Sequence, residues 1–251
     1  MWNFFSPKVI FGDDSLQWLA QIKGRRAFVV TDQNIVRLGF LEAVSEQLMV
    51  AGLEVGSFTE IEPEAHLLTV ERCAQVMTEF APDWVIGLGG GSCIDASKAA
   101  WIRYERPDIP LEAINPLETY ELRQKARLVT IPTTAGSGSD VSQAAMLLDT
   151  EERRKIYIVC YEFIADYSIV DPRFTLNAPA ELTADAGIDV LNHAIDTYNS
   201  TLSNDFVDGL SLHAAKLVFE NLAAAVSNTF MVLLKVSTQA PAVEVKVYFM
   251  K

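Results

Sequence analysis

The chain has 251 residues, and half of them are hydrophobic. This length and composition fit one large or two modest globular domains that fold without disulfide bonds or structural metal ions. Its formal net charge of −13 argues against nucleic-acid binding and against docking on anionic membranes, because both require clustered Lys and Arg. No apolar run approaches the ~18 residues that a membrane helix needs, so no membrane span is predicted. Cys73, Cys93 and Cys160 form neither a disulfide framework nor a CxxC metal site. Together with an N-terminus unlike a signal peptide, they predict a cytoplasmic protein.

The first part of the chain alternates strand-like and helix-like segments. Buried strands are predicted at 27–31, 53–58, 84–88 and 128–131, with helical patterns at 35–48, 67–80 and 95–102 between them. Residues 141–170 look more strand-like, with apolar runs at 145–148 and 156–159. This alternation predicts an α/β fold with a doubly wound sheet.

After Asp171-Pro172 the alternation of predicted strands and helices stops. Two Ala-rich helices are predicted there, at 179–198 and 205–226. We therefore expect a nucleotide-binding domain over 1–172 and the beginning of an all-helical domain over 173–227. The tail, 228–251, has a single acidic residue, Glu244, and alternates like a lone strand at 243–248. Two interpretations stay open: a frameshifted or truncated reading frame, or a short strand that pairs with the sheet.

A glycine-rich loop, Gly89-Gly90-Gly91-Ser92, lies between the predicted strand at 84–88 and a helix that opens near Ser92. Glycines allow the backbone to approach an anion, and the helix N-terminus offers free N–H groups, so a pyrophosphate is the natural ligand. Asp95 forms a capping-box variant with Ser92, and Lys98, one turn on, is within reach of a phosphate or a carboxylate. The alternative is a tight turn without a ligand, since Ser92 replaces the third glycine of the usual dinucleotide fingerprint.

A second loop of small and hydroxylated residues, 132–140, follows the strand at 128–131. Ligands of open α/β sheets bind beyond the carboxyl ends of the strands, so both loops are expected to face one crevice. Asp32 ends the strand at 27–31. Its carboxylate would accept hydrogen bonds from ribose hydroxyls and repel a 2′-phosphate, which favours NAD over NADP, although an Asp there is more often a helix N-cap.

Asp189 and His193 lie at positions i and i+4 of the predicted helix 179–198, so both point to one side. A carboxylate and an imidazole there suit iron, zinc or manganese, but a complete site needs at least one more protein ligand. By spacing alone, a simple side-chain pair is the more common explanation. The other histidines, His66 and His213, are interpreted as a surface residue and as a packing residue.

In their order and spacing, four segments resemble the iron-containing (group III) alcohol dehydrogenases across roughly residues 4–227. These segments are Gly89-Gly90-Gly91-Ser92-x-x-Asp95-x-x-Lys98, Pro132 to Asp140, Asp171-Pro172, and Gly187-Ile188-Asp189-x-Leu191-x-His193-Ala194-Ile195-Asp196-x-Tyr198. The resemblance implies a dehydroquinate-synthase-like fold with the site in the cleft between its two domains. It also implies NAD, Fe2+ (or Zn2+) and a small alcohol or aldehyde as ligands, and a homodimer.

The resemblance further implies roles for individual residues. Cofactor contacts are implied at Asp32, Gly90, Gly91, Ser92, Asp95, Thr133, Thr134, Ser142, Lys155 and Leu182, and the first two metal ligands at Asp189 and His193. The family uses one Asp and three His, and neither His66 nor His213 matches the last two. The chain therefore resembles a C-terminally shortened member. An NAD-dependent alcohol dehydrogenase is expected, and a catalytically impaired nucleotide-binding fragment or a glycerol-dehydrogenase-like zinc enzyme are the alternatives.

Overall fold

A computed structural model describes residues 5–227 of the protein. The chain folds as two compact units. The first comprises the residues up to Thr133 together with Gly138–Asp171, and the second comprises Thr134–Ser137 and the residues from Pro172 onward.

A six-stranded sheet with the order β1-β8-β5-β4-β2-β3 forms the centre of the first unit, and every neighbouring pair is parallel. The strands are β1 (Lys8–Phe11), β2 (Arg26–Val30), β3 (Glu54–Phe58), β4 (Trp84–Gly89), β5 (Arg127–Pro132) and β8 (Tyr167–Val170). All six residues of β4 are buried, as expected for a central parallel strand covered on both faces. The predicted α/β class is confirmed.

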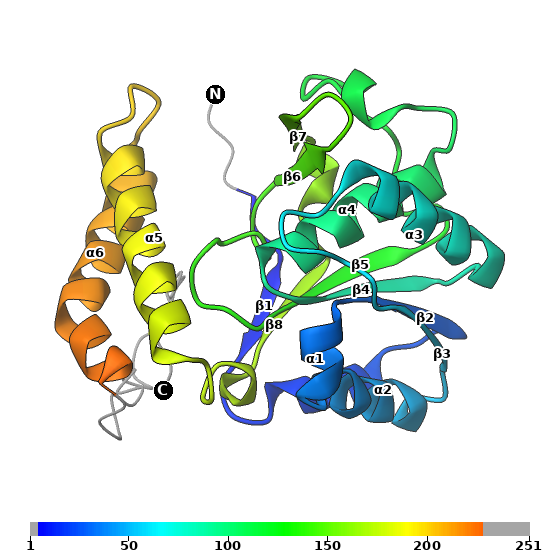
Figure 1. Ribbon diagram of the computed structural model, residues 1–251, viewed down its shortest axis with the longest axis horizontal. Coiled ribbons are helices and arrows are strands. Elements are labelled where there is room, and N and C mark those ends of the chain that lie inside the picture. Colours follow the sequence, from blue (N-terminus) through cyan, green and yellow to red (C-terminus); the bar gives the residue numbers. More distant parts are fainter. Residues whose placement is uncertain (1–4, 228–251) are drawn as a thin grey trace. The chain divides into compact units, whose positions relative to one another are not determined.

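Helices cover the sheet on both faces, with α3 (Leu67–Phe80) and α4 (Gly91–Glu105) opposite α1 (Gln33–Arg37) and α2 (Phe40–Val50) (Figure 1). Helix α3 has the predicted bounds, because its apolar residues recur at helical spacing and form one buried face. The single helix predicted at 35–48 is wrong: Gly39, with φ +74°, breaks it into α1 and α2. Short 3-10 helices in this unit are η1 (Ser15–Gln21), η2 (Leu111–Ala113) and η3 (Tyr161–Phe163).

A separate antiparallel hairpin, β6 (Ala144–Asp149) and β7 (Arg154–Val159), pairs from Ala144↔Val159 to Asp149↔Arg154. Asp149 closes its turn by accepting the N–H groups of Glu151 and Glu152. Strand β6 is tied to α4, since the N–H of Met146 donates to Asp95 Oδ2 at 3.0 Å. The hairpin thus covers part of the helix that follows the glycine loop.

The long connection between α4 and β5 is organised by the buried carboxylate of Glu105, which is 6% exposed. It accepts the backbone N–H groups of Gln124, Lys125 and Ala126 at 2.7–3.2 Å. Hydrogen bonds to a charged acceptor are among the stronger ones, and a buried N–H without a partner is costly.

Replacing Glu105 with alanine is therefore expected to lower the free energy of unfolding by about 2–4 kcal/mol, measured by urea denaturation. Glu112→Ala, at an exposed position, is the control and should change it by less than about 0.5 kcal/mol. Equal effects of the two substitutions would show that Glu105 does not hold the connection.

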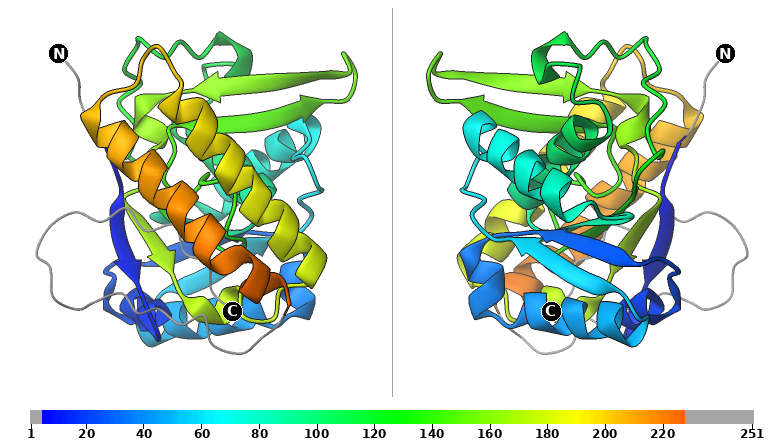
Figure 2. Two further views of the ribbon diagram at one scale, coloured as in Figure 1. Left: turned by 90° about the vertical axis from the view of Figure 1, so that its left-hand side faces the viewer. Right: turned by 90° about the vertical axis from the view of Figure 1, so that its right-hand side faces the viewer.

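From Pro172 on, the second unit consists of the 3-10 helix η4 (Pro172–Phe174) and a helical hairpin of α5 (Ala180–Tyr198) and α6 (Asp205–Val226), which lie side by side (Figure 2). Their bounds match the two predicted helices within one residue. Asn204 caps α6 by accepting the N–H groups of Phe206 and Val207, and the small core of the hairpin comprises Val190, Ala194, Ala214 and Val218. Over residues 5–227, no helix has the length and apolar character to cross a membrane. The predicted strand at 243–248 lies outside the described residues.

Candidate cofactor and metal sites

The glycine loop lies where β4 ends and α4 begins, at the carboxyl edge of the sheet. Gly89 has φ +144°, and a Cβ there would lie 2.7 Å from Cys93 Sγ, so only glycine fits. Gly90 is the N-cap of α4 and no side chain caps the helix, which leaves its first N–H groups open toward the half-buried loop. This uncapped helix end is suited to an anionic group.

Ser92 does not form the predicted capping box. The helix starts at Gly91, so Ser92 lies inside the first turn and the capping box with Asp95 is wrong. Instead, Ser92 Oγ accepts the backbone N–H of Glu64 at 3.0 Å. Its own proton is then available to a ligand, because a hydroxyl can accept and donate at once.

The second loop begins directly beside the first. The N–H of Thr133 donates to the carbonyl oxygen of Gly89 at 3.0 Å, and the side chain of Thr133 is buried. Residues Thr134–Ser137 belong to the second unit, where Gly136 packs closely on α5: a Cβ on Gly136 would lie 3.0 Å from Ala186 Cβ and 3.1 Å from its Cα. The glycine of this loop therefore permits close approach to a helix.

Asp32 takes the N-cap role, one of the two roles weighed for it. Its Oδ1 accepts the N–H groups of Asn34 and Ile35 at 2.7 and 3.0 Å, as an N-cap of α1. Its Oδ2 lies 3.3 Å from Cys93 Sγ. Burial and the Asp32 carboxylate both raise the pKa of the Cys93 thiol, so the sulfur stays protonated and donates to Asp32. The half-buried carboxylate is held by these contacts just after β2, and its oxygens have further lone pairs that can accept hydrogen bonds.

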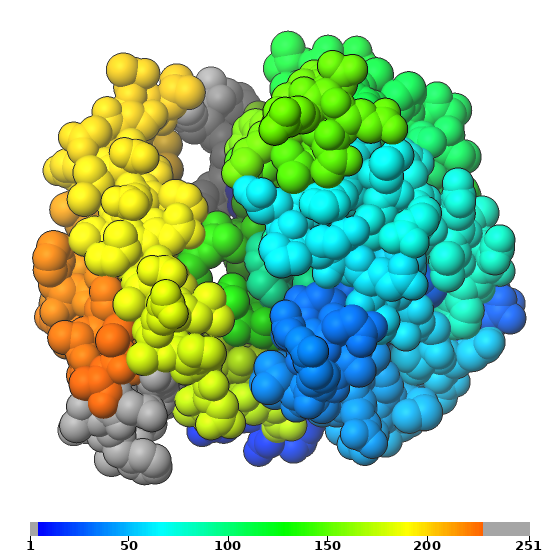
Figure 3. Space-filling model, in the orientation of Figure 1, coloured from blue at the N-terminus to red at the C-terminus, as the bar shows by residue number. Residues whose placement is uncertain are grey.

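Lys155 of strand β7 contacts Glu64, which lies just before α3. Lys155 Nζ pairs with Glu64 Oε1 at 2.7 Å, and this contact lowers the pKa of Glu64. The segment around residue 60 and the hairpin meet at the surface (Figure 3). Glu64, with φ +62°, thus holds Ser92 through its backbone and Lys155 through its side chain. The sequence around Glu64 does not predict these two contacts, because Ser92 and Lys155 lie far away in the sequence.

Two of the predicted cofactor contacts are engaged inside the protein. Asp95 is 9% exposed and its carboxylate binds the hairpin through Met146. Ser142 Oγ lies 3.2 Å from the Nζ of Lys98. Lys98 does not face the glycine loop, since its ammonium is buried among carbonyl oxygens.

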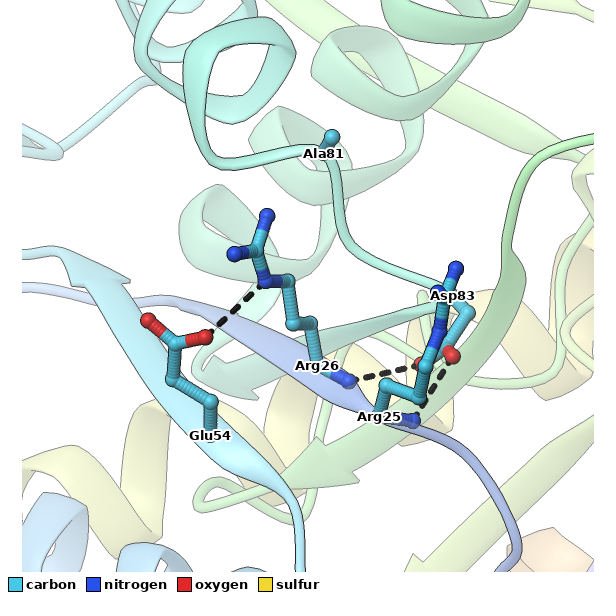
Figure 4. Close-up of a pocket in the computed structure, with 5 residues that line it drawn as sticks. All are labelled: Arg25, Arg26, Glu54, Ala81 and Asp83. Atoms are coloured by element: carbon cyan, nitrogen blue, oxygen red, sulfur yellow. Dashed lines mark hydrogen bonds and ion pairs between the residues drawn. The ribbon is translucent and has the colours of Figure 1, made fainter.

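A pocket on the first unit lies at the opposite, amino edge of the sheet, lined by Arg25, Arg26, Glu54, Ala81 and Asp83 (Figure 4). Its acids are occupied by the protein itself: Asp83 accepts the N–H groups of Arg25 and Arg26, and Glu54 pairs with Arg26 at 2.9 Å. These contacts tie strand ends together. We assign the pocket a structural role.

The two predicted metal ligands, Asp189 and His193, lie on α5 of the second unit. Asp189 Oδ1 and His193 Nε2 are 3.6 Å apart, and their side chains are 46% and 58% exposed. The spacing predicted on the helix is therefore present, and both donors are accessible. Leu182, in the first turn of the same helix, is 42% exposed.

Among the residues that the structure describes, no third ligand joins this pair. Within residues 5–227, no group of three or more His, Cys, Asp or Glu side chains is placed to hold an ion. His66 lies 3.6 Å from Glu62 in the first unit, and His213 is half-buried on α6. The described residues thus supply two donors of the kind that a transition metal prefers, but not a closed site.

An open parallel sheet with a glycine loop and an uncapped helix start at its carboxyl edge is typical of nucleotide-binding α/β proteins. Two family models match the chain: iron-containing alcohol dehydrogenase over residues 6–172, and the C-terminal part of the Fe-containing alcohol dehydrogenase family over residues 183–230. The chain belongs to the iron-containing alcohol dehydrogenase family.

Similar proteins agree with this assignment. The chain is 38% identical over 239 residues to an aldehyde-alcohol dehydrogenase of Streptococcus pneumoniae, covering 90% of this chain and 27% of that protein. It is 36% identical over 225 residues to an NADPH-dependent butanol dehydrogenase of Clostridium saccharobutylicum, covering 88% and 58%. A sulfoacetaldehyde reductase from Bifidobacterium kashiwanohense, solved in complex with NAD+, superposes with a TM-score of 0.82 at 28% identity, covering 90% of this chain and 61% of that one. The chain thus spans less than two thirds of each of these three proteins.

Proposed function

We propose that this chain binds NAD(H) and takes part in hydride transfer between an alcohol and an aldehyde. The observation that carries the proposal is the uncapped start of α4, open behind Gly90, beside Thr133 and at the carboxyl edge of a parallel sheet. The cofactor supplies the redox chemistry, and the protein supplies binding and orientation.

The proposal assigns the residues predicted to bind the cofactor to different parts of NAD(H). Gly90 and Gly91 donate backbone N–H groups to the pyrophosphate, and Ser92 donates its hydroxyl, oriented by Glu64. Asp32 accepts from the ribose hydroxyls. The remaining predicted contacts are Thr133, Thr134, Ser142 and Lys155, with Leu182 as an apolar contact and Asp95 acting through the hairpin that it binds.

The metal in this proposal is a divalent ion, Fe2+ or Zn2+, held in part by Asp189 and His193. The pair fits two places of such a ligand set, because both donors lie on one side of α5 and are accessible. When bound, the ion supplies Lewis acidity to the alcohol oxygen. A second function, nucleotide binding without turnover, is favoured by one observation: residues 5–227 provide no third ligand.

Asp32 is the residue that sets cofactor preference in this proposal. Asp32→Ser keeps a side-chain N-cap for α1 but removes the negative charge that would face a 2′-phosphate. We expect the ratio of NADPH to NADH affinity to rise roughly tenfold, equivalent to about 1.4 kcal/mol, in fluorescence titrations. An unchanged ratio would place the ribose elsewhere. The relative that uses NADPH makes this measurement informative for the present chain.

The proposal also includes a cellular location and an oligomeric state. The three free and buried cysteines, Cys73, Cys93 and Cys160, support a reducing, cytoplasmic location. The homodimer remains a prediction.

The test uses the full 251-residue chain, purified and supplied with Fe2+ or Zn2+. NADH binding is measured by fluorescence, and NAD reduction is measured with a panel of short alcohols. Binding together with metal-dependent turnover supports the whole proposal. Binding without turnover leaves the nucleotide-binding function alone, and no binding contradicts both.

A further inference from the structure

A buried lysine lies between α4 and the segment that follows the second loop. Lys98 is 0% exposed. Its Nζ lies 2.5 Å from the carbonyl oxygen of Ser139, 2.8 Å from that of Ser142 and 2.9 Å from that of Ala144. An ammonium has three protons, so these three carbonyls satisfy it, and Ser142 Oγ lies further away at 3.2 Å.

The charge of Lys98 is balanced from two sides. Asp95 of α4 and Asp140 of the bound segment both act on it electrostatically. Asp140 is itself fixed, since its Oδ2 accepts from Ser168 of β8 and its carbonyl accepts from Thr130 of β5. The segment from Ser139 to Ala144 is therefore tied to the sheet through Asp140 and to α4 through Lys98.

Residues 139–143 of the bound segment lie in neither a helix nor a strand, and Ala144 is the first residue of β6. The segment runs from the end of the second loop into β6, and it carries Ser142, one of the proposed cofactor contacts. Its carbonyl oxygens at three positions all accept from one nitrogen on α4, the Nζ of Lys98. Since α4 begins at the glycine loop, Lys98 connects the two loops that the cofactor is proposed to use.

We infer that Lys98 is a positioning residue whose ammonium holds residues 139–144 against α4 and so preorganises the nucleotide site. The inference rests on the proposed NAD(H) binding. The charged form is essential, because a neutral amine has only two protons and would turn its lone pair toward a carbonyl oxygen. Loss of the proton therefore releases one of the three carbonyls.

The titration of Lys98 predicts a pH dependence of NADH binding that tests this positioning role. Burial lowers the pKa of Lys98 to about 8, opposed by Asp95 and then Asp140. Cofactor binding to the held segment favours the ammonium and raises the pKa of Lys98 in the complex. NADH binding then takes up a proton above pH 8, and its affinity falls as pH rises.

The titration of Lys98 changes the folding stability with pH in the opposite direction to NADH affinity. The unfolded chain, with an ordinary lysine pKa near 10.5, binds more protons than the folded chain between pH 8 and 10.5. The contribution of Lys98 to stability therefore rises with pH in that window. A fall in NADH affinity over the same range thus cannot come from Lys98 simply destabilising the fold.

The test compares the full chain with Lys98→Met and Lys98→Arg, and with Lys125→Met as a control at an exposed lysine. Kd for NADH is measured from pH 7 to pH 9, and amide hydrogen exchange of residues 139–146 is measured without cofactor. For the parent and Lys125→Met, Kd for NADH should rise roughly fivefold between pH 7 and pH 9, within the limit of tenfold per pH unit for one proton.

Lys98→Met should bind NADH roughly tenfold more weakly at pH 7, its affinity should not depend on pH, and its amides at 139–146 should exchange faster. Lys98→Arg, which stays charged, should restore part of the affinity without the pH dependence.

Equal affinity and equal exchange in Lys98→Met and the parent would overturn the inference while leaving NADH binding intact. An unchanged pH slope in Lys98→Met would overturn it as well. If the parent binds no NADH at any pH, the proposed function fails, and unchanged exchange in Lys98→Met then overturns the positioning role independently.

Discussion

Gly89→Ala should abolish tight NADH binding and lower the free energy of unfolding by about 2–6 kcal/mol. Two costs add at this position. The backbone has φ +144°, a conformation that L side chains rarely adopt and that costs about 1–3 kcal/mol. The new Cβ would also lie 2.7 Å from Sγ and 2.8 Å from Cβ of Cys93, and such overpacking typically costs about 1–3 kcal/mol. Relief of the clash would move the start of α4, where the pyrophosphate is proposed to bind.

Gly12→Ala is the matched control for this substitution. Gly12 also has a positive φ, +110°, but nothing lies within 4 Å of its added Cβ. It should therefore show the backbone cost alone, with NADH affinity retained. Urea denaturation and fluorescence titration measure the two effects. Equal losses of stability in both variants, with NADH binding intact in Gly89→Ala, would contradict the role given to the β4–α4 turn.

Asp189→Ala and His193→Ala should each remove bound Fe2+ or Zn2+ and reduce NAD-dependent alcohol oxidation roughly a thousandfold, since Lewis-acid stabilisation is worth several kcal/mol. Both residues have accessible side chains, so loss of the fold is not expected. NADH affinity should stay within about twofold, because the proposed nucleotide contacts of the first unit are untouched. Metal content per chain and initial rates provide the measurements.

Asp196→Ala tests whether any acid on α5 has the same effect. Asp196 is exposed on the same helix and belongs to no described cluster of ligands. It should leave metal content and turnover unchanged. Undiminished metal binding in both Asp189→Ala and His193→Ala would show that this pair is not part of the metal site.

The sequence by itself determined the class of fold and the local elements. Helices α3, α5 and α6 follow from apolar residues at helical spacing, and β4 and β5 follow from short buried runs between polar turns. The glycine loop and the Asp189/His193 pair were also visible, because each depends on neighbours within one turn of chain. Local periodicity and steric preference act over a few residues, so they leave a readable pattern.

Only the tertiary structure decided which partners these residues take. Ser92 receives the N–H of Glu64, Asp95 binds Met146, and Lys98 turns inward to the Ser139–Ala144 segment. A hydrogen bond or an ion pair between distant parts of the chain depends on a distance of a few ångströms that no local pattern encodes. Strand order is of the same kind, since β8 lies between β1 and β5 only because the whole sheet buries them together. Polar side chains near the site bind whichever donor or acceptor the fold brings within reach, because a buried polar group without a partner is too costly to persist.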